Sequence, residues 1–241
     1  MFKLDSPFMN FLNKVCDIMI LNLLVLFCSI PIFTIGASVT AGYYIAYKMV
    51  RNEEGYITKG FFKAFKENFK QSTIIWLIMI AVGLLLYGDY KIILNDEMQI
   101  GNWMRIAVIT VSVVVGLGAV FIFPVQARFS NTVKNTIKNG FLMALSHLPS
   151  AFLCLASLIV PFVLLYFLPQ IGPAVLLLAV GLLIYFKAML YLKIFRKYEE
   201  RIEEAQAESG VEAQESVETS QDEDSGIFSV SDSMEKESEN K

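Results

Sequence analysis

The sequence predicts an all-α, polytopic membrane protein with six transmembrane helices and two amphipathic helices on the cytoplasmic membrane surface. Of its 241 residues, 55% are hydrophobic and only 18% are charged, whereas a soluble domain averages about 25% charged residues. Several apolar runs approach the roughly 20 residues that a helix needs to cross a bilayer. Lysine and arginine also gather in alternate loops, which is typical of membrane proteins with a fixed orientation.

The charged residues divide the chain into two parts. Residues 1–198 carry 17 Lys and Arg against 8 Asp and Glu, whereas residues 199–241 carry 3 against 15. The first part is the predicted membrane domain. The second is rich in Ser, Glu, Gln and Asp and has few residues that can form a core, so we expect an acidic, disordered cytoplasmic tail.

Five apolar runs are clear candidates for membrane spans: residues 18–35, 74–90, 103–125, 147–168 and 174–192. A sixth run, 36–50, is short and rich in small residues. If it crosses, 15 Lys and Arg lie on the cytoplasmic side and only Lys91 and Arg105 lie outside. If it does not cross, every later loop changes side and this bias is lost. We therefore predict six spans with both termini in the cytoplasm.

The first span also imitates a cleaved signal peptide, because Lys14 and an apolar run precede Val39-Thr40-Ala41. Cleavage there would remove the first span and leave the second too short to cross. We therefore expect the first helix to remain uncleaved.

A break between the first two spans is the candidate ligand site. Short spans interrupted by Pro or Gly often mark transporter sites, because unwound backbone offers free polar groups. Ser38, Gly42 and Ala46, however, repeat every four residues, which is typical of a helix face that packs closely on its neighbours, and tyrosines often anchor span ends. We favour this packing interpretation over a ligand site. The candidate ligand or packing residues are Pro31, Thr34, Gly36, Ser38, Gly42, Tyr43, Tyr44 and Tyr47.

Ionisable side chains are scarce within the apolar runs. Asp17 and Lys187 lie near span ends, from which we expect their charges to reach the interface, and Asn22 is the only amide well inside the first span. Ion-coupled transporters normally carry buried carboxylates. The composition therefore argues against that mechanism, but a pathway for an uncharged solute stays open.

Two cytoplasmic loops combine an aromatic face with a lysine face, which favours helices lying on an anionic leaflet. The first loop carries Phe61, Phe62, Phe65 and Phe69 beside Lys59, Lys63, Lys66 and Lys70. The second loop carries Phe129, Val133, Ile137 and Phe141 beside Lys134 and Lys138. Calmodulin or a nucleic acid would bind similar residues, but the flanking spans favour lipid, and we expect no nucleic-acid partner.

The two loops share a short sequence echo, Gly60-Phe61-Phe62-Lys63-Ala64-Phe65 and Gly140-Phe141-Leu142-Met143-Ala144-Leu145. Internal duplication and similar interfacial constraints both explain it.

Catalytic and metal-binding motifs are lacking. The sequence contains no P-loop, no H-E-x-x-H, no G-x-S-x-G and no pair of aspartates within a span. Cys16, Cys28, Cys154 and the single His147 do not have the spacing of metal ligands. We therefore expect no enzymatic activity and no cofactor.

Three segments carry a resemblance to a known family. "PIFTIGASVTAGYY", "RNEEGYITKGFFKAFKENFKQSTIIW" and "RFSNTVKNTIKNGF" resemble the YesL family of bacterial integral membrane proteins, a domain of unknown function. The resemblance covers roughly residues 1–198 and implies a multi-pass protein of the bacterial plasma membrane, often encoded among genes for carbohydrate uptake. It implies an accessory or assembly component of a sugar transporter; a small transporter or channel for an uncharged solute is the alternative.

Overall fold

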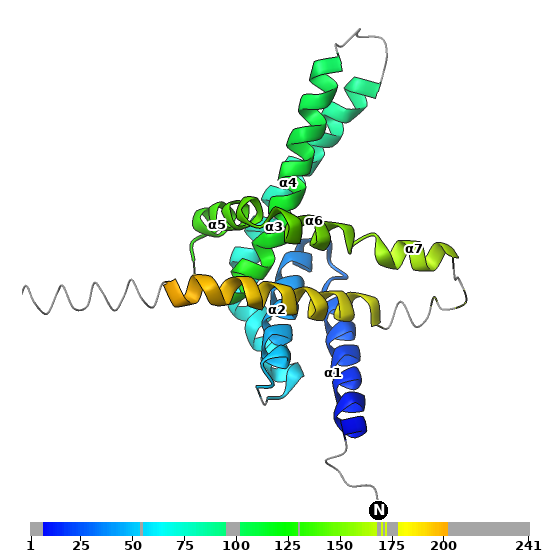
Figure 1. Cartoon of the computed structure of the whole chain (residues 1–241), viewed down its shortest axis with the longest axis vertical. Helices are drawn as coiled ribbons and strands as arrows, with labels where there is room; N and C mark the ends of the chain where they lie inside the picture. Colours follow the sequence, from blue (N-terminus) through cyan, green and yellow to red (C-terminus); the bar gives the residue numbers. More distant parts are fainter. Residues whose placement is uncertain are drawn as a thin grey trace, which may run out of the picture. The chain divides into compact units, whose positions relative to one another are not determined.

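The computed structural model describes residues 7–53, 55–94, 102–129, 131–167, 170, 172 and 178–201, and their regular elements are all helical (Figure 1). The all-α class is confirmed for these residues. In chain order the elements are α1 (Pro7–Cys28), the 3-10 turn η1 (Ile32–Thr34), α2 (Ile35–Val50), α3 (Ile57–Leu94), α4 (Asn102–Arg128), α5 (Val133–Ser146), α6 (Leu148–Ala156) and α7 (Val160–Phe167). A further helix, Leu178–Arg201, follows and is called the last helix below.

The chain divides into two compact units, Met1–Leu192 and Lys193–Lys241. The first unit contains α1 to α7 and most of the last helix. The predicted boundary between membrane domain and acidic tail lies between residues 198 and 199, and tail residues 202–241 lie outside the described residues.

Several helices are long and apolar enough to cross a membrane. Within the described part of the chain these are Phe11–Cys28, Ile57–Ile93, Trp103–Arg128 and Leu178–Arg201. A fifth span results if α5 and α6, which are bent by 102° relative to each other, count as one. These helices are consistent with a multi-pass membrane protein of four to five spans.

The short run 36–50 lies within α2, a helix of 16 residues. At 1.5 Å per residue α2 is about 24 Å long, less than the roughly 30 Å of a hydrocarbon core. Ten of its residues are buried, so other helices surround it more than lipid does. Its crossing, and hence the six-span arrangement, stays a prediction.

The predicted span 147–168 is not one helix. It consists of α6 and α7, which a turn at residues 157–159 separates; residue 168 is outside the described residues. Pro161 is the second residue of α7 and lacks the N–H that would continue a helix from α6. The Ser157 hydroxyl donates to the Cys154 carbonyl oxygen at 2.7 Å, which helps to end α6. The expectation of one continuous helix was therefore wrong.

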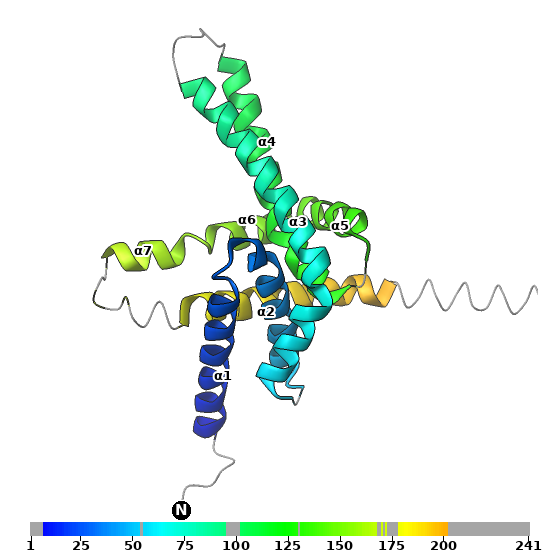
Figure 2. The same cartoon turned by 180° about the vertical axis from the view of Figure 1, so that it is seen from behind.

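The first amphipathic loop is continuous with a span. α3 has 38 residues and includes both the Phe/Lys stretch and the predicted span 74–90. Between Lys70 and Ile74 there is no Gly or Pro to interrupt the helix. α3 and α4 run side by side in both views (Figures 1 and 2). A separate interfacial helix in this loop was therefore a wrong expectation.

The second amphipathic loop forms α5, which packs on α4. The side chain of Thr132 caps its N-terminus by accepting a hydrogen bond from the backbone N–H of Asn135. A Cβ added to Gly140 would lie 2.8 Å from Cγ1 of Ile122, so the two helices are in close contact. Lys134 and Lys138 are exposed, as predicted.

Candidate functional site

The backbone carbonyl groups at the break between α1 and α2 accept hydrogen bonds from within the protein. The Thr34 hydroxyl lies 2.6 Å from the Cys28 carbonyl oxygen and 2.7 Å from that of Pro31. The indole N–H of Trp76 on α3 donates to the Ile32 carbonyl oxygen at 2.7 Å. Carbonyl groups that the end of α1 leaves without helical donors therefore find donors within the protein, which favours a structural joint over an open ligand site.

The small residues of the candidate set lie at close helix crossings. A Cβ added to Gly36 would lie 2.7 Å from the Ser72 carbonyl oxygen and 2.8 Å from the Trp76 Cβ. A Cβ on Gly42 would lie 3.0 Å from Val25 and 3.1 Å from Ile184. Only glycine allows such approaches without displacement of a neighbour. These contacts favour the packing interpretation for both positions.

Hydroxyl groups join α2 to α3. Ser72 donates to the hydroxyl oxygen of Thr40 at 3.0 Å, and Thr40 donates to the Gly36 carbonyl oxygen at 2.8 Å. Ser72, Thr40 and Ser38 are all fully buried. The Ser38 hydroxyl has no hydrogen-bond partner among the described residues.

The tyrosines of α2 lie in different surroundings. Tyr43 and Tyr47 are buried, whereas Tyr44 is half-buried and has the Lys48 ammonium 5.1 Å from its ring centre. Pro31, at the start of the candidate stretch, is exposed. The structure thus places the predicted residues from Gly36 to Tyr47 on one short helix, α2, and Pro31 and Thr34 in the break before it. Their side chains contact several different neighbours.

A tyrosine hydroxyl from another helix compensates for a proline in α4. Pro124 lies inside this helix and lacks the N–H that would bond to the Val120 carbonyl oxygen. The Tyr191 hydroxyl donates to that oxygen at 3.0 Å, and the Tyr47 hydroxyl donates to the Pro124 carbonyl oxygen at 3.2 Å. Tyr191 was not among the predicted site residues; the proline within an apolar run was the signal that a donor from another helix was needed.

Asn22 has a comparable structural role. It is fully buried in α1, and its side-chain oxygen accepts a hydrogen bond from the Gly181 N–H of the last helix at 2.9 Å. A Cβ on Gly181 would lie 2.6 Å from the Ile18 carbonyl oxygen. The one amide well inside the first span therefore fixes a close crossing of two helices.

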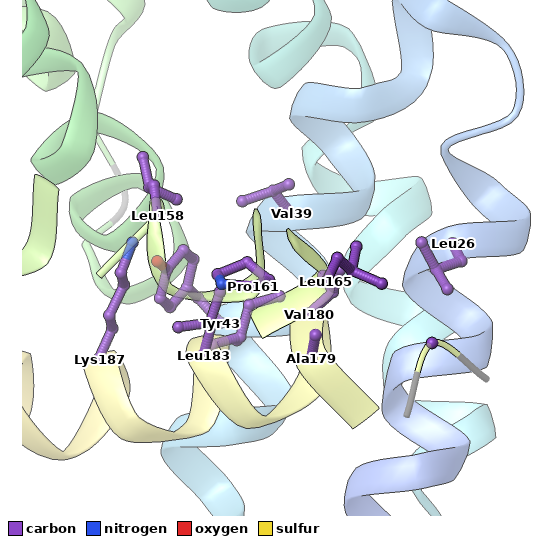
Figure 3. Close-up of a pocket in the computed structure, with 12 residues that line it drawn as sticks. Leu26, Val39, Tyr43, Leu158, Pro161, Leu165, Ala179, Val180, Leu183 and Lys187 are labelled. Carbon is purple, nitrogen blue, oxygen red and sulfur yellow. The ribbon is translucent and has the colours of Figure 1, made fainter. Parts of the chain in front are cut away.

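A cavity of about 660 Å³ lies beside the other face of α2 (Figure 3). Four helices of the first unit contribute to its wall, and the lining is almost entirely apolar. Its lining includes Leu26 of α1, Val39 and Tyr43 of α2, Leu165 of α7, and Leu183 and Lys187 of the last helix.

Lys187 is the charged residue of this cavity, and its side chain is enclosed by protein, whereas we expected an exposed charge near a span end. The residue is only 3% exposed. Among the described residues, no Asp or Glu forms a salt bridge with it. Cys154, a buried thiol that also contacts Tyr191, is a titratable neighbour. Burial on one face of the last helix explains why proximity to a span end did not predict exposure.

The predicted membrane-interface residues divide into two groups. Lys59, Lys63, Lys66 and Lys70 are exposed, and so is the Phe62 ring, at 48%. Phe61 is fully buried and lies with its ring centre 6.2 Å from that of Phe65, so it packs on protein and does not enter the headgroup region. Phe65 and Phe69 are half-buried.

The described residues contain no group of three or more His, Cys, Asp or Glu side chains that can hold a metal ion. His147, the single histidine of the sequence, lies at the boundary between α5 and α6.

The apolar helices and their internal packing are those expected of a multi-pass membrane protein. A family model described as "Protein of unknown function, DUF624" matches residues 18–90. The matched part extends from α1 through α2 into α3 and includes the break, Gly36 and the Thr40–Ser72 contact. No curated protein and no solved structure matched the chain.

Proposed function

We propose that the chain is an accessory or assembly component of a carbohydrate-uptake system in the bacterial plasma membrane, with six spans and both termini in the cytoplasm. The proposal assigns it no catalytic step. The link to carbohydrate uptake rests on the resemblance of residues 1–198 to the YesL family. The choice of an accessory role over a transport role rests on the geometry of α2.

The observation that carries this choice is the use of residues 31–47 in internal contacts. Neighbouring helices occupy the space beside Gly36 and Gly42. The carbonyl groups of the break accept hydrogen bonds from Thr34 and Trp76. A sugar offers many hydroxyls, which a site must meet with several convergent polar groups. In this stretch the hydroxyls of Thr34, Thr40 and Tyr47 already donate to groups within the protein.

The length of α3 supports the proposed threading. Lys63 and Lys91 are 28 positions apart on this continuous helix, or about 42 Å at 1.5 Å per residue. A bilayer with its headgroup regions is about 40–45 Å thick. One crossing by α3 is therefore compatible with Lys63 and Lys91 on opposite sides of the membrane, as the proposed threading requires.

Isolation of the tagged full chain from native membranes in mild detergent tests the accessory role. We expect membrane components of a sugar transporter to copurify in near-stoichiometric amounts, as measured by quantitative mass spectrometry. Recovery of the protein alone would contradict the proposal. Another multi-pass protein with the same tag provides the control for detergent carry-over.

Exposed aromatic side chains allow a sharper version of this experiment. Tyr56 is 80% exposed and Phe62 is 48% exposed, both beside the lysines of the first loop. If partners bind this surface, the double variant Tyr56→Ser/Phe62→Ser should lose them without loss of folding. Tyr166→Ser, at an 82% exposed position of α7, is the matched control and should retain them.

The alternative, a small transporter or channel for an uncharged solute, is favoured by one observation. Val39 and Tyr43 of the candidate stretch line the cavity. Uptake of radiolabelled sugars into vesicles containing the purified protein separates the two functions. Flux that disappears in Val39→Trp would favour transport, whereas absence of flux for every sugar tested would exclude it.

A further inference from the structure

The cavity has the dimensions of a site for a small hydrophobic ligand. Its volume of about 660 Å³ lies within the roughly 300–1,000 Å³ that is usual for ligand sites. Ala179, Leu183 and Lys187 line it at four-residue intervals along one face of the last helix, a rise of about 12 Å. Leu26 and Lys187 lie at opposite ends of the labelled lining (Figure 3).

The two ends of the cavity differ in polarity. Leu26, Ala179 and Val180 provide an apolar end. Lys187 marks the other end, and Tyr43 belongs there too, because its ring centre lies 5.9 Å from that of Tyr191, one turn beyond Lys187. An amphiphile with a chain and a polar head matches this arrangement.

The buried Lys187 indicates the charge of the polar head that the cavity would accept. A buried charge is costly unless an opposite charge or hydrogen bonds compensate it. Lys187 is 3% exposed, and no carboxylate within the described ranges forms a salt bridge with it. An anionic head would supply the missing partner, with the Tyr43 hydroxyl as a further donor.

The wall beside α7 indicates that the amphiphile would come from the lipid bilayer. Leu165 of α7 and Leu158 of the turn before it line the cavity and are still 42% and 44% exposed, and Phe167, at the end of α7, is 72% exposed. The cavity thus adjoins an apolar outer surface, which in a membrane protein faces lipid. A lipid can enter from the side without leaving the bilayer.

We propose that this cavity binds one acyl chain of an anionic phospholipid, with the lipid phosphate paired to the Lys187 ammonium. In the predicted threading, Lys187 lies toward the cytoplasmic leaflet, which is rich in anionic lipid. The bound lipid fills the space between α2 and the last helix and neutralises the buried charge.

Native mass spectrometry of the purified full chain tests this site. The protein is equilibrated with equal amounts of phosphatidylglycerol and phosphatidylcholine that have identical acyl chains. We expect one retained phosphatidylglycerol, preferred by about tenfold, because its head keeps a net negative charge beside Lys187, whereas the choline ammonium of phosphatidylcholine offsets its phosphate. Lys187→Met should remove the preference, and Lys187→Arg should keep it. Lys138→Met, at an exposed lysine of α5, is the matched control and should behave as the wild type.

A second variant tests the apolar end without changing a charge. Ala179→Phe should reduce the retention of both lipids, because its ring occupies the space of the chain. Circular dichroism and gel filtration verify that each variant is folded. An unchanged preference in Lys187→Met, or unchanged retention in Ala179→Phe, would overturn the proposal. So would recovery of a free fatty acid in place of phospholipid from the protein isolated from native membranes.

Discussion

The two faces of α2 are built in different ways. Toward α3 and α4, Gly36, Thr40 and Tyr47 make close backbone contacts and hydrogen bonds. On the other face, Val39 and Tyr43 line a cavity of about 660 Å³. Positions three or four residues apart on a helix of 16 residues therefore serve either as a joint between helices or as the wall of a ligand site.

The largest effect is expected where a side chain enters the packed face. Gly36→Leu should lower the free energy of unfolding by about 3 kcal/mol, because its Cβ would lie 2.7 Å from a backbone oxygen. Titration of the detergent-solubilised protein with a denaturing detergent, followed by circular dichroism, measures this change. Gly83→Leu on α3, where an added Cβ meets no atom within 4 Å, should leave stability unchanged or raise it by up to about 1 kcal/mol, because leucine favours a helix more than glycine does. Equal losses in both variants would refute the close contact.

An alanine-to-leucine substitution at two positions compares a closely packed site with one that faces the cavity. Ala41 in α2 is fully buried, so Ala41→Leu should cost about 2 kcal/mol through overpacking. Ala179 lines the cavity, so Ala179→Leu should be neutral or raise stability by about 0.5 kcal/mol in delipidated protein. Thermal unfolding of both variants in one detergent checks the difference, and a larger loss at Ala179 would show that the cavity is filled by protein.

A double-mutant cycle tests the bond that replaces the missing donor in α4. Tyr191→Phe should cost about 1 kcal/mol, because the Val120 carbonyl oxygen loses its donor. In a Pro124→Ala background the restored N–H can bond to that oxygen, so the same change should cost much less. Chemical unfolding of the four proteins gives the coupling energy. Strict additivity would show that the two groups are independent.

The smallest effect is expected for the hydroxyl pair between α2 and α3. Ser72→Ala removes the hydrogen bond to Thr40 but leaves Thr40 bonded to the Gly36 carbonyl oxygen. The free energy of unfolding should fall by about 0.5 kcal/mol, as measured by chemical unfolding. A loss of several kcal/mol would mean that this pair, and not the glycine contact, determines the packing.

The helical class and the regions of the four long candidate spans could be predicted from the sequence, because apolar length is a local property. The small residues of α2 were also informative, since the four-residue spacing of Ser38, Gly42 and Ala46 favoured a closely packed face. Pro161, likewise, was a local signal for the start of a helix, but the apolar run around it concealed the break.

Other features depend on contacts between distant residues. The burial of Lys187 follows from the elements that line the cavity around it, and the role of Tyr191 follows from a proline 67 positions earlier. α3 is continuous through residues 71–73, so the expected separate amphipathic helix does not exist there. The charge pattern predicted which face is exposed, but such a pattern does not show where a helix ends.

Cysteine labelling in intact bacteria tests the central claim, that α2 crosses the membrane and the chain has six spans. Single cysteines replace Lys63 or Lys91, both exposed on α3, in a full chain whose Cys16, Cys28 and Cys154 are changed to Ala. A membrane-impermeant maleimide should label position 91 in intact cells and position 63 only after permeabilisation. Labelling of position 63 in intact cells would contradict the six-span arrangement.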